Sequence, residues 1–159
     1  MKKHQKSRRE ECPVARSLEV VGDRWSLLII RNAFDGIRRF GEFQKDLGVS
    51  KSVLASRLHI LVSNGILRVE PSTDGGAYQE YGLTEKGRGL FHAMVGLRQW
   101  GEAFLFSRNE EHSVMVDRSS QESVHPLELR SQQGKLLTPN DVVIRKVRAR
   151  EGSRSRIPG

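Results

Sequence analysis

Apolar residues between positions 40 and 65 recur at helical spacing on both sides of a short interruption. The apolar positions of the first segment are Phe40, Phe43 and Leu47, and those of the second are Leu54, Leu58 and Leu61. Gly48 separates the two series, and Ser50 is a residue type that caps helix N-termini well. The pattern therefore predicts two short helices joined by a tight turn.

The opposite side of the second predicted helix is small, polar and weakly basic. Its positions, at a rotation of about 100° per residue, are Lys51, Ser52, Ala55, Ser56, His59 and Ser63, with Ser50 at the start. This face carries no acid, and its small side chains allow the helix backbone to approach another surface closely. Such a face suits the major groove of DNA, and a solvated helix face is the alternative.

Two more helices are predicted before this motif and a β-hairpin after it. Cys12-Pro13 has the pattern of an N-cap followed by proline at the first helical position, and Gly22 ends this helix. Asp23 caps the next helix. The expected inward positions are Val14, Leu18 and Val21 in the first helix, and Trp25, Leu28, Ile29 and Ile30 in the second. Residues 66–69 and 79–83 are typical of paired strands, so we expect a wing.

A long helix is expected to start at the Thr84 cap. Its apolar positions are Leu90, Met94, Leu97, Trp100 and Phe104. These residues form an apolar surface on the helix that is broader than one small domain can cover. We therefore expect the helix both to dock on its own domain and to pair with its copy in a second subunit. A helix buried within its own chain is the alternative.

The predicted fold is mainly α-helical: a winged helix-turn-helix with a β-hairpin wing, dimerised through the long helix, with a small C-terminal β appendage. Apolar segments at 114–116, 124–129 and 142–144 are the expected short strands. The expected division is a basic arm at 1–11, the DNA-binding and dimerisation domain at 12–106, a C-terminal extension at 107–147 and a basic, disordered tail at 148–159.

The net charge of +8 lies entirely in the two ends of the chain. Residues 1–11 carry +3 and residues 145–159 carry +5, whereas residues 12–144 are neutral. Basic ends add sequence-independent attraction to a polyanion, or serve only as solvated tails.

The remaining composition argues against several classes of protein. Cys12 is the only cysteine, so a disulfide within the chain or a multi-cysteine metal site cannot form, and a reducing cytoplasm is expected. We find no apolar run of membrane-spanning length and no signal peptide. No catalytic constellation, metal-ligand spacing or cofactor motif is recognisable, so we expect neither an enzyme, nor a metal, nor a cofactor.

Several short motifs occur in one order along residues 11–106. They are Cys12–Val14, Gly22–Trp25, Arg39–Phe43, Leu54–Leu58, Gly65–Leu67 and Tyr81–Gly87. In the identity and order of these motifs, the chain resembles the HxlR-type winged helix-turn-helix transcriptional regulators, which are related to the MarR-type regulators. The resemblance implies a cytoplasmic homodimer that binds a palindromic operator in double-stranded DNA and represses or activates nearby genes, with repression favoured.

The sequence departs from this family in two places. The expected wing tip, residues 72–76, contains Asp74 and no basic residue, which argues against insertion of the wing into the minor groove. The C-terminal part resembles an extension that carries cysteine knuckles in some longer members, but Ser119-Ser120 and residues 131–134 stand where thiolates would be needed. No metal is expected there.

Three arginines near the motif have open roles. Arg57 lies within the apolar arc of the second helix, so it either joins the DNA-binding surface or pairs with an acid such as Glu42 or Asp46. Arg38 and Arg39 precede the first helix and are either a phosphate clamp or part of a solvated loop.

Cys12 is a candidate regulatory thiol, because the resemblance implies oxidant or electrophile sensing through a cysteine at this place. A thiol at a helix N-terminus also faces free backbone N–H groups, a setting typical of reactive cysteines. A simple helix cap is the alternative.

Two other functions stay open at this point. A dimeric protein-interaction adaptor on a degenerate winged helix would explain the neutral body and the acidic wing. A regulator controlled by a small-molecule effector of unknown identity, bound between the long helix and the wing, would also fit.

Overall fold

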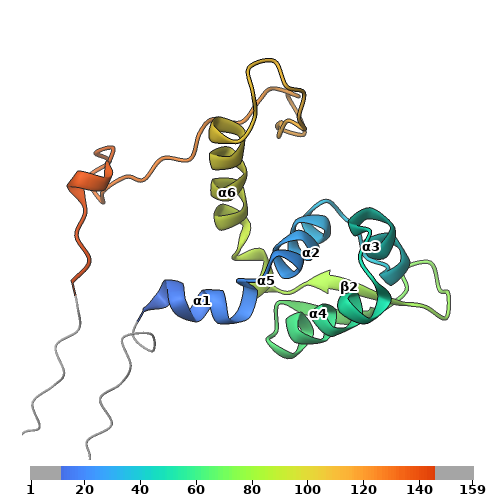
Figure 1. The fold of residues 1–159 in the computed structure, drawn as a ribbon. Coiled ribbons are helices and arrows are strands. Elements are labelled where there is room, and N and C mark those ends of the chain that lie inside the picture. Colours follow the sequence, from blue (N-terminus) through green and yellow to red (C-terminus); the bar gives the residue numbers. More distant parts are fainter. Residues whose placement is uncertain (1–11, 146–159) are drawn as a thin grey trace, which may run out of the picture. The chain divides into compact units, whose positions relative to one another are not determined.

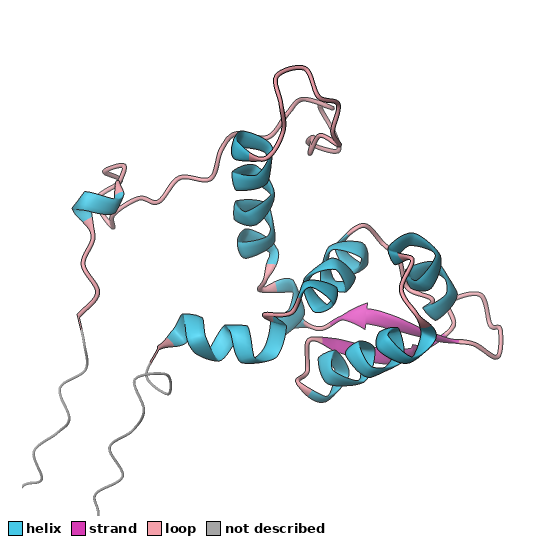
Figure 2. Cartoon of the chain, viewed as in Figure 1, coloured by secondary structure: helices cyan, strands magenta, loops and turns pink. Residues whose placement is uncertain are grey.

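A computed structural model describes residues 12–145, and the basic arm and the tail expected at 1–11 and 148–159 lie outside the described residues. The chain divides into two compact units, Met1–Val114 and Met115–Gly159. Figures 1 and 2 show helices around one β-hairpin in the first unit. Its elements are α1 (Pro13–Val21), α2 (Arg24–Phe34), α3 (Phe40–Leu47), α4 (Lys51–Ser63), β1 (Leu67–Pro71), β2 (Gln79–Leu83), α5 (Glu85–Arg88) and α6 (Phe91–Phe104).

Local capping signals determine where the first two helices begin. Cys12 is the N-cap of α1 and Pro13 occupies its first position, where proline loses no helical hydrogen bond. Asp23 is the N-cap of α2, and its Oδ1 accepts hydrogen bonds from the backbone N–H groups of Trp25 at 3.1 Å and Ser26 at 3.0 Å. The predicted boundaries of both helices are therefore confirmed.

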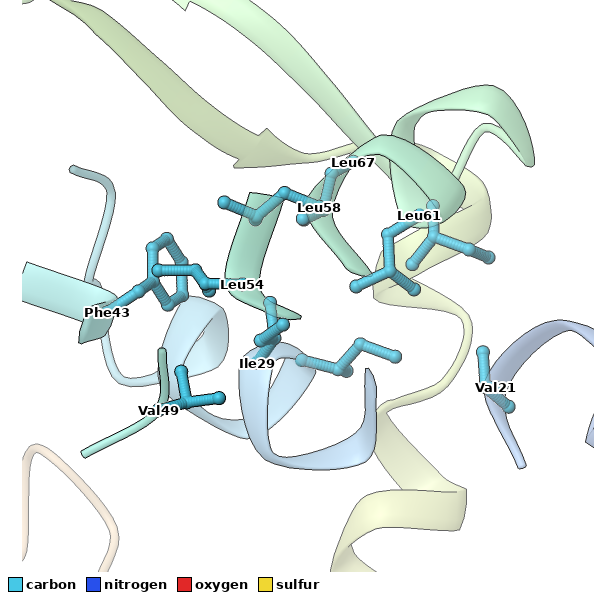
Figure 3. Packing of buried hydrophobic residues seen from close by; sticks show 10 residues of the cluster. Val21, Ile29, Phe43, Val49, Leu54, Leu58, Leu61 and Leu67 are labelled. Atoms are coloured by element: carbon cyan, nitrogen blue, oxygen red, sulfur yellow. The ribbon is translucent and has the colours of Figure 1, made fainter. Parts of the chain in front are cut away.

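The hydrophobic core lies where α2, α3, α4 and the start of β1 meet (Figure 3). Its fully buried apolar side chains are Ile29, Ile30, Phe43, Leu54, Leu58, Leu61 and Leu67. Burying a side chain of this size stabilises the fold by roughly 1.5–3 kcal/mol. Ile29 and Ile30 are fully buried, as expected. The inward placement was wrong for Leu28, which lies outside the core cluster, and for Val14 and Leu18, which are exposed.

The wing is an antiparallel hairpin, as predicted. The register pairs Leu67 with Leu83 and Pro71 with Gln79, so β1 begins one residue later than expected and continues to the proline. An isolated bridge joins Arg39 to Glu80, and the backbone N–H of Tyr81 donates to the carbonyl oxygen of Arg38 at 2.8 Å. The segment before α3 is therefore attached to the free edge of β2.

The expectation of a single long helix from Thr84 was wrong, because the chain forms two helices there, the short α5 and then α6. Thr84 does cap α5 by accepting from the N–H of Gly87 at 3.0 Å. Gly87 lies so close to Ile66, the residue before β1, that a Cβ atom at position 87 would stand 2.2 Å from the Ile66 carbonyl oxygen. α5 is thus held against the hairpin, and the chain leaves it through Gly89 and Leu90, where a turn bond from Leu90 N–H to Gly87 O replaces the helical one.

The expected C-terminal β appendage is reduced to two isolated bridges within the described residues of the second unit. These bridges pair Val116 with Ser123 and Arg130 with Leu136, and a 3-10 helix follows at Pro139–Asp141. Residues 124–129 and 142–144 form no strand. Almost every described side chain of this unit is exposed, so its apolar residues have no core against which a sheet could pack.

Candidate nucleic-acid interface

The turn between α3 and α4 orients the second helix of the motif. Gly48 adopts a left-handed conformation (φ 60°) at the C-terminus of α3, a conformation that glycine reaches without steric cost. Ser50 then caps α4, where its hydroxyl accepts from the N–H of Val53 at 3.4 Å. Because Leu54, Leu58 and Leu61 are buried in the core, the rotation of α4 about its axis is determined.

The face of α4 opposite these leucines is open to solvent. Lys51, Ser52, Ala55, Ser56, His59 and Ser63 are all exposed, as is Ser50 at the cap. The hydroxyls of Ser50 and Ser52 lie 3.3 Å apart. The structure thus brings the predicted α4 residues together on one small, polar surface that contains no carboxylate of its own helix.

Arg57 pairs with an acid, which is one of the two roles expected for it, but that acid is neither Glu42 nor Asp46. Its Nε lies 3.4 Å from Oδ1 of Asp23, the N-cap of α2. Asp46 instead forms an ion pair with Arg31 at 2.9 Å. Glu42 accepts from the backbone N–H of Arg39 at 3.1 Å and so caps α3.

Arg38 and Arg39 are both neutralised by carboxylates of the wing. Nε of Arg38 lies 3.1 Å from Oε2 of Glu80, and its Nη2 pairs with Glu70. Nε of Arg39 lies 3.4 Å from Oε1 of Glu80, and its Nη2 pairs with Asp74 at the wing tip. The two candidate phosphate-clamp residues are therefore joined to the wing in one charged network.

Glu80 is the buried centre of this network, with 3% of its side chain exposed. Burial raises the pKa of its carboxyl, but hydrogen bonds from Ser72, Arg39 and Thr73 outweigh that effect and lower the pKa from its ordinary value. Glu80 thus stays ionised near neutral pH and keeps both arginines paired.

Sequence reasoning missed this network, although one signal for it is present in the chain. Arg39 precedes the motif, and its partner Glu80 lies 41 residues further on. Only the attachment of the Arg39 segment to β2 places the two opposite each other. Glu70 and Glu80 are a directly opposed pair of acids in the hairpin register. Like charges at such a position destabilise a sheet unless cations lie nearby, and that pairing could have indicated the two arginines.

The predicted dimer-interface residues divide into two groups. Leu90 and Met94 pack against the core of their own chain. Leu97, Trp100 and Phe104 lie further along α6 and are 49%, 53% and 71% exposed. The structure therefore leaves the outer part of α6 as an uncovered apolar surface.

Cys12 is a free, half-buried thiol at the start of α1. Its side chain makes no capping hydrogen bond. Within residues 12–145, no group of three His, Cys, Asp or Glu side chains is arranged to hold a metal ion. None of the helices in that range is long and apolar enough to cross a membrane.

Among the described residues, two cavities border the hairpin. One, of about 720 Å³, lies between the start of α3 and the wing and is lined in part by Arg39, Phe40 and Tyr78. The other, of about 240 Å³, lies among α2, the hairpin and α5, and its lining includes Phe34, Arg68 and Arg88.

Comparisons with known proteins agree with this architecture. The family model described as HxlR-like helix-turn-helix matches residues 20–110. An uncharacterised HTH-type transcriptional regulator of Mycobacterium tuberculosis, Rv3095, is 49% identical over 92 residues, which are 58% of this chain and 58% of that protein. The chain thus spans less than two thirds of that relative.

Two solved structures are similar as well. PA1607, described as a candidate transcription factor, is 46% identical with a TM-score of 0.82, over 90% of this chain and 97% of that one. The redox regulator HypR in its reduced form is 31% identical with a TM-score of 0.53, over 58% of this chain and 92% of that one. With the family model matching more than half of its length, the chain belongs to the HxlR-like helix-turn-helix family.

Proposed function

We propose that this protein is a sequence-specific, DNA-binding transcriptional regulator of the cytoplasm, which acts as a homodimer on a palindromic operator in double-stranded DNA. The observation that carries the proposal is the exposed, acid-free face of α4, held outward by three buried leucines. A helix presented in this way can enter the major groove, where Lys51, Ser52, Ser56 and His59 would meet base edges and phosphates. Membership of the HxlR-like family supports this assignment.

The homodimer is supported by the apolar surface of α6. Trp100 and Phe104 lie with their ring centroids 6.0 Å apart, and both are exposed. Val14 and Leu18 of α1 are exposed too, at 66% and 58%. Figure 1 shows α1 and α6 extending from the helix-turn-helix body. A second copy would cover both helices and place two α4 helices about one turn of DNA apart.

Regulation through Cys12 is the finer part of the proposal. The thiol stands at the start of α1, beside the proposed interface, and it has no intramolecular cysteine partner. HypR, a structurally similar protein, is named as a redox regulator. An external oxidant that accepts two electrons and two thiol protons would convert Cys12 to a bridge with a second subunit or to a mixed disulfide with a small thiol. Either product would shift α1 against the partner subunit and respace the α4 helices.

A protein-interaction adaptor is the second candidate, and the pairing of Arg38 and Arg39 with wing carboxylates favours it. A winged helix whose phosphate-clamp arginines are neutralised has a weaker long-range attraction to DNA. Association that is insensitive to salt, without any affinity for DNA, would distinguish this function.

The decisive experiment is selection of bound fragments from genomic DNA of the source organism with purified full-length protein. We expect enrichment of a palindromic sequence, a mobility shift with that fragment and dimeric sedimentation at micromolar concentration. A monomer that shifts no genomic fragment would disprove the proposal.

A further inference from the structure

The wing tip holds the guanidinium of Arg39 through a carboxylate that is itself fixed in place. Asp74 pairs with Nη2 of Arg39 through Oδ2. Its other oxygen, Oδ1, accepts from the Ser72 hydroxyl at 2.6 Å and from the Gly76 N–H at 3.0 Å. These hydrogen bonds, together with Arg39, hold the pKa of Asp74 well below its usual range. The carboxylate is thus fully charged and preoriented at neutral pH.

Arg38 and Arg39 differ in how firmly they are held. Both Arg38 partners, Glu70 and Glu80, are largely buried, with 24% and 3% of their side chains exposed. Asp74 is 56% exposed, so its pair with Arg39 is open to water and to competing ions. Exposed ion pairs contribute little free energy, and a second anion can replace the carboxylate at low cost. Both arginines therefore share the buried Glu80, and Arg39 can exchange only its second, exposed partner, Asp74.

We infer that Asp74 is a built-in competitor for the DNA phosphate that Arg39 would bind. A phosphate oxygen offers a guanidinium the same charge-assisted hydrogen bonds as a carboxylate does. When DNA reaches the start of α3, a backbone phosphate replaces Asp74 on Nη2 of Arg39, while Nε stays beside Glu80. Asp74 thereby lowers the affinity of the protein for the DNA backbone. This inference rests on the proposed function.

The substitution Asp74→Asn separates this role from the structure of the turn. Asparagine keeps the Oδ1 acceptor for Ser72 and Gly76, but it replaces Oδ2 with an uncharged NH2 group that cannot accept a hydrogen bond from Arg39. Asp35→Asn is the matched control, because it changes the net charge equally at an exposed residue at the end of α2. Arg39→Gln, alone and combined with Asp74→Asn, shows whether any gain passes through Arg39.

The measurement is the affinity of the full-length variants for a random-sequence duplex between 50 and 200 mM salt, roughly the range over which phosphate contacts weaken steeply. We expect Asp74→Asn to tighten binding by about two- to tenfold and to steepen the salt slope by up to about 0.9, the value of one additional phosphate contact. In the Arg39→Gln background, the same change should have no more effect than Asp35→Asn. Equal thermal midpoints of unfolding would show that the fold is retained.

Two patterns of gain in affinity would overturn the inference. One is a gain from Asp74→Asn that Asp35→Asn reproduces, and the other is a gain that persists without Arg39. If the wild type binds DNA but Asp74→Asn has the same affinity as the wild type, the competitor role fails and the proposed function stands. If the wild type and all variants fail to bind any duplex, the proposed function fails and the inference fails with it.

Discussion

Nε of Arg57 in α4 lies 3.4 Å from Oδ1 of Asp23, the residue that caps α2. One carboxylate therefore joins two helices, because it accepts from the first turn of α2 and pairs with the helix that presents the proposed DNA-binding face. Burial raises the pKa of Asp23, but the Ser26 hydroxyl, the Ser26 N–H, Arg57 and the Trp25 N–H together lower it below its ordinary value of 3.8.

Removal of this carboxylate should destabilise the protein. We expect Asp23→Ala to lower the free energy of unfolding by about 1 kcal/mol, with a range of roughly 0.5–2, because α2 loses its N-cap. Asp23→Asn keeps an acceptor at the cap and should cost less. Because folding lowers the pKa of Asp23, its contribution is present above pH 3.8 and is lost as the pH falls further.

Urea unfolding between pH 7 and pH 3 checks this prediction. Wild type should lose more stability on acidification than Asp23→Asn does. Parallel pH profiles for the two proteins would show that the charge on Asp23 is unimportant.

Lys51, the first residue of α4, should contact DNA. If it meets a phosphate, Lys51→Ala will weaken binding to all sequences and reduce the salt slope by about 0.9. If it meets a guanine edge, the same change will cost about 1–3 kcal/mol and relax one base position. Arg108→Ala, an exposed site beyond α6, is the control for charge. Mobility shifts with wild-type and single-base variant operators would measure both effects. If Lys51→Ala binds with the affinity, salt slope and base preference of the wild type, this lysine lies outside the interface.

Trp100 should be a major contributor to dimerisation, since its side chain is large, apolar and uncovered. Aromatic residues at the centre of an interface commonly contribute about 2 kcal/mol or more, so Trp100→Ala should weaken the dimer by about thirtyfold. Val69→Ala, at a β1 residue that is 42% exposed, should leave the dimer intact. Sedimentation over a concentration series would measure the dimer dissociation constant of each variant. An unchanged constant for Trp100→Ala would show that α6 does not form the dimer interface.

Cys12 should make operator affinity sensitive to oxidants. We expect diamide treatment to change the affinity of the wild type and to leave Cys12→Ser unaffected, because serine keeps the small polar cap without a thiol. Reduction with dithiothreitol should restore the original affinity. Equal responses of the two proteins, or no response in wild type, would leave Cys12 as a helix cap only.

The sequence by itself determined the features that depend on short-range geometry. The spacing of Leu54, Leu58 and Leu61 determines which side of α4 is buried and which side carries Lys51, because a helix rotates by the same angle at each residue. Asp23 determines the start of α2 for a similar reason, since a cap bonds backbone groups two and three residues away.

Tertiary structure alone decided the charge pairing and the division of α5 from α6. Arg57 and Asp23 are 34 positions apart in the chain, and Arg39 and Asp74 are 35 apart, so no local pattern relates either pair. Both depend on how helices and hairpin pack. Similarly, Gly87 is an ordinary weak helix former in the sequence, but in the fold it meets the Ile66 carbonyl so closely that the helix is held there and restarts at Phe91. Sequence periodicity predicts which face of a helix or strand a residue occupies. An ion pair or a steric contact depends on the distance between remote segments, and tertiary packing determines that distance.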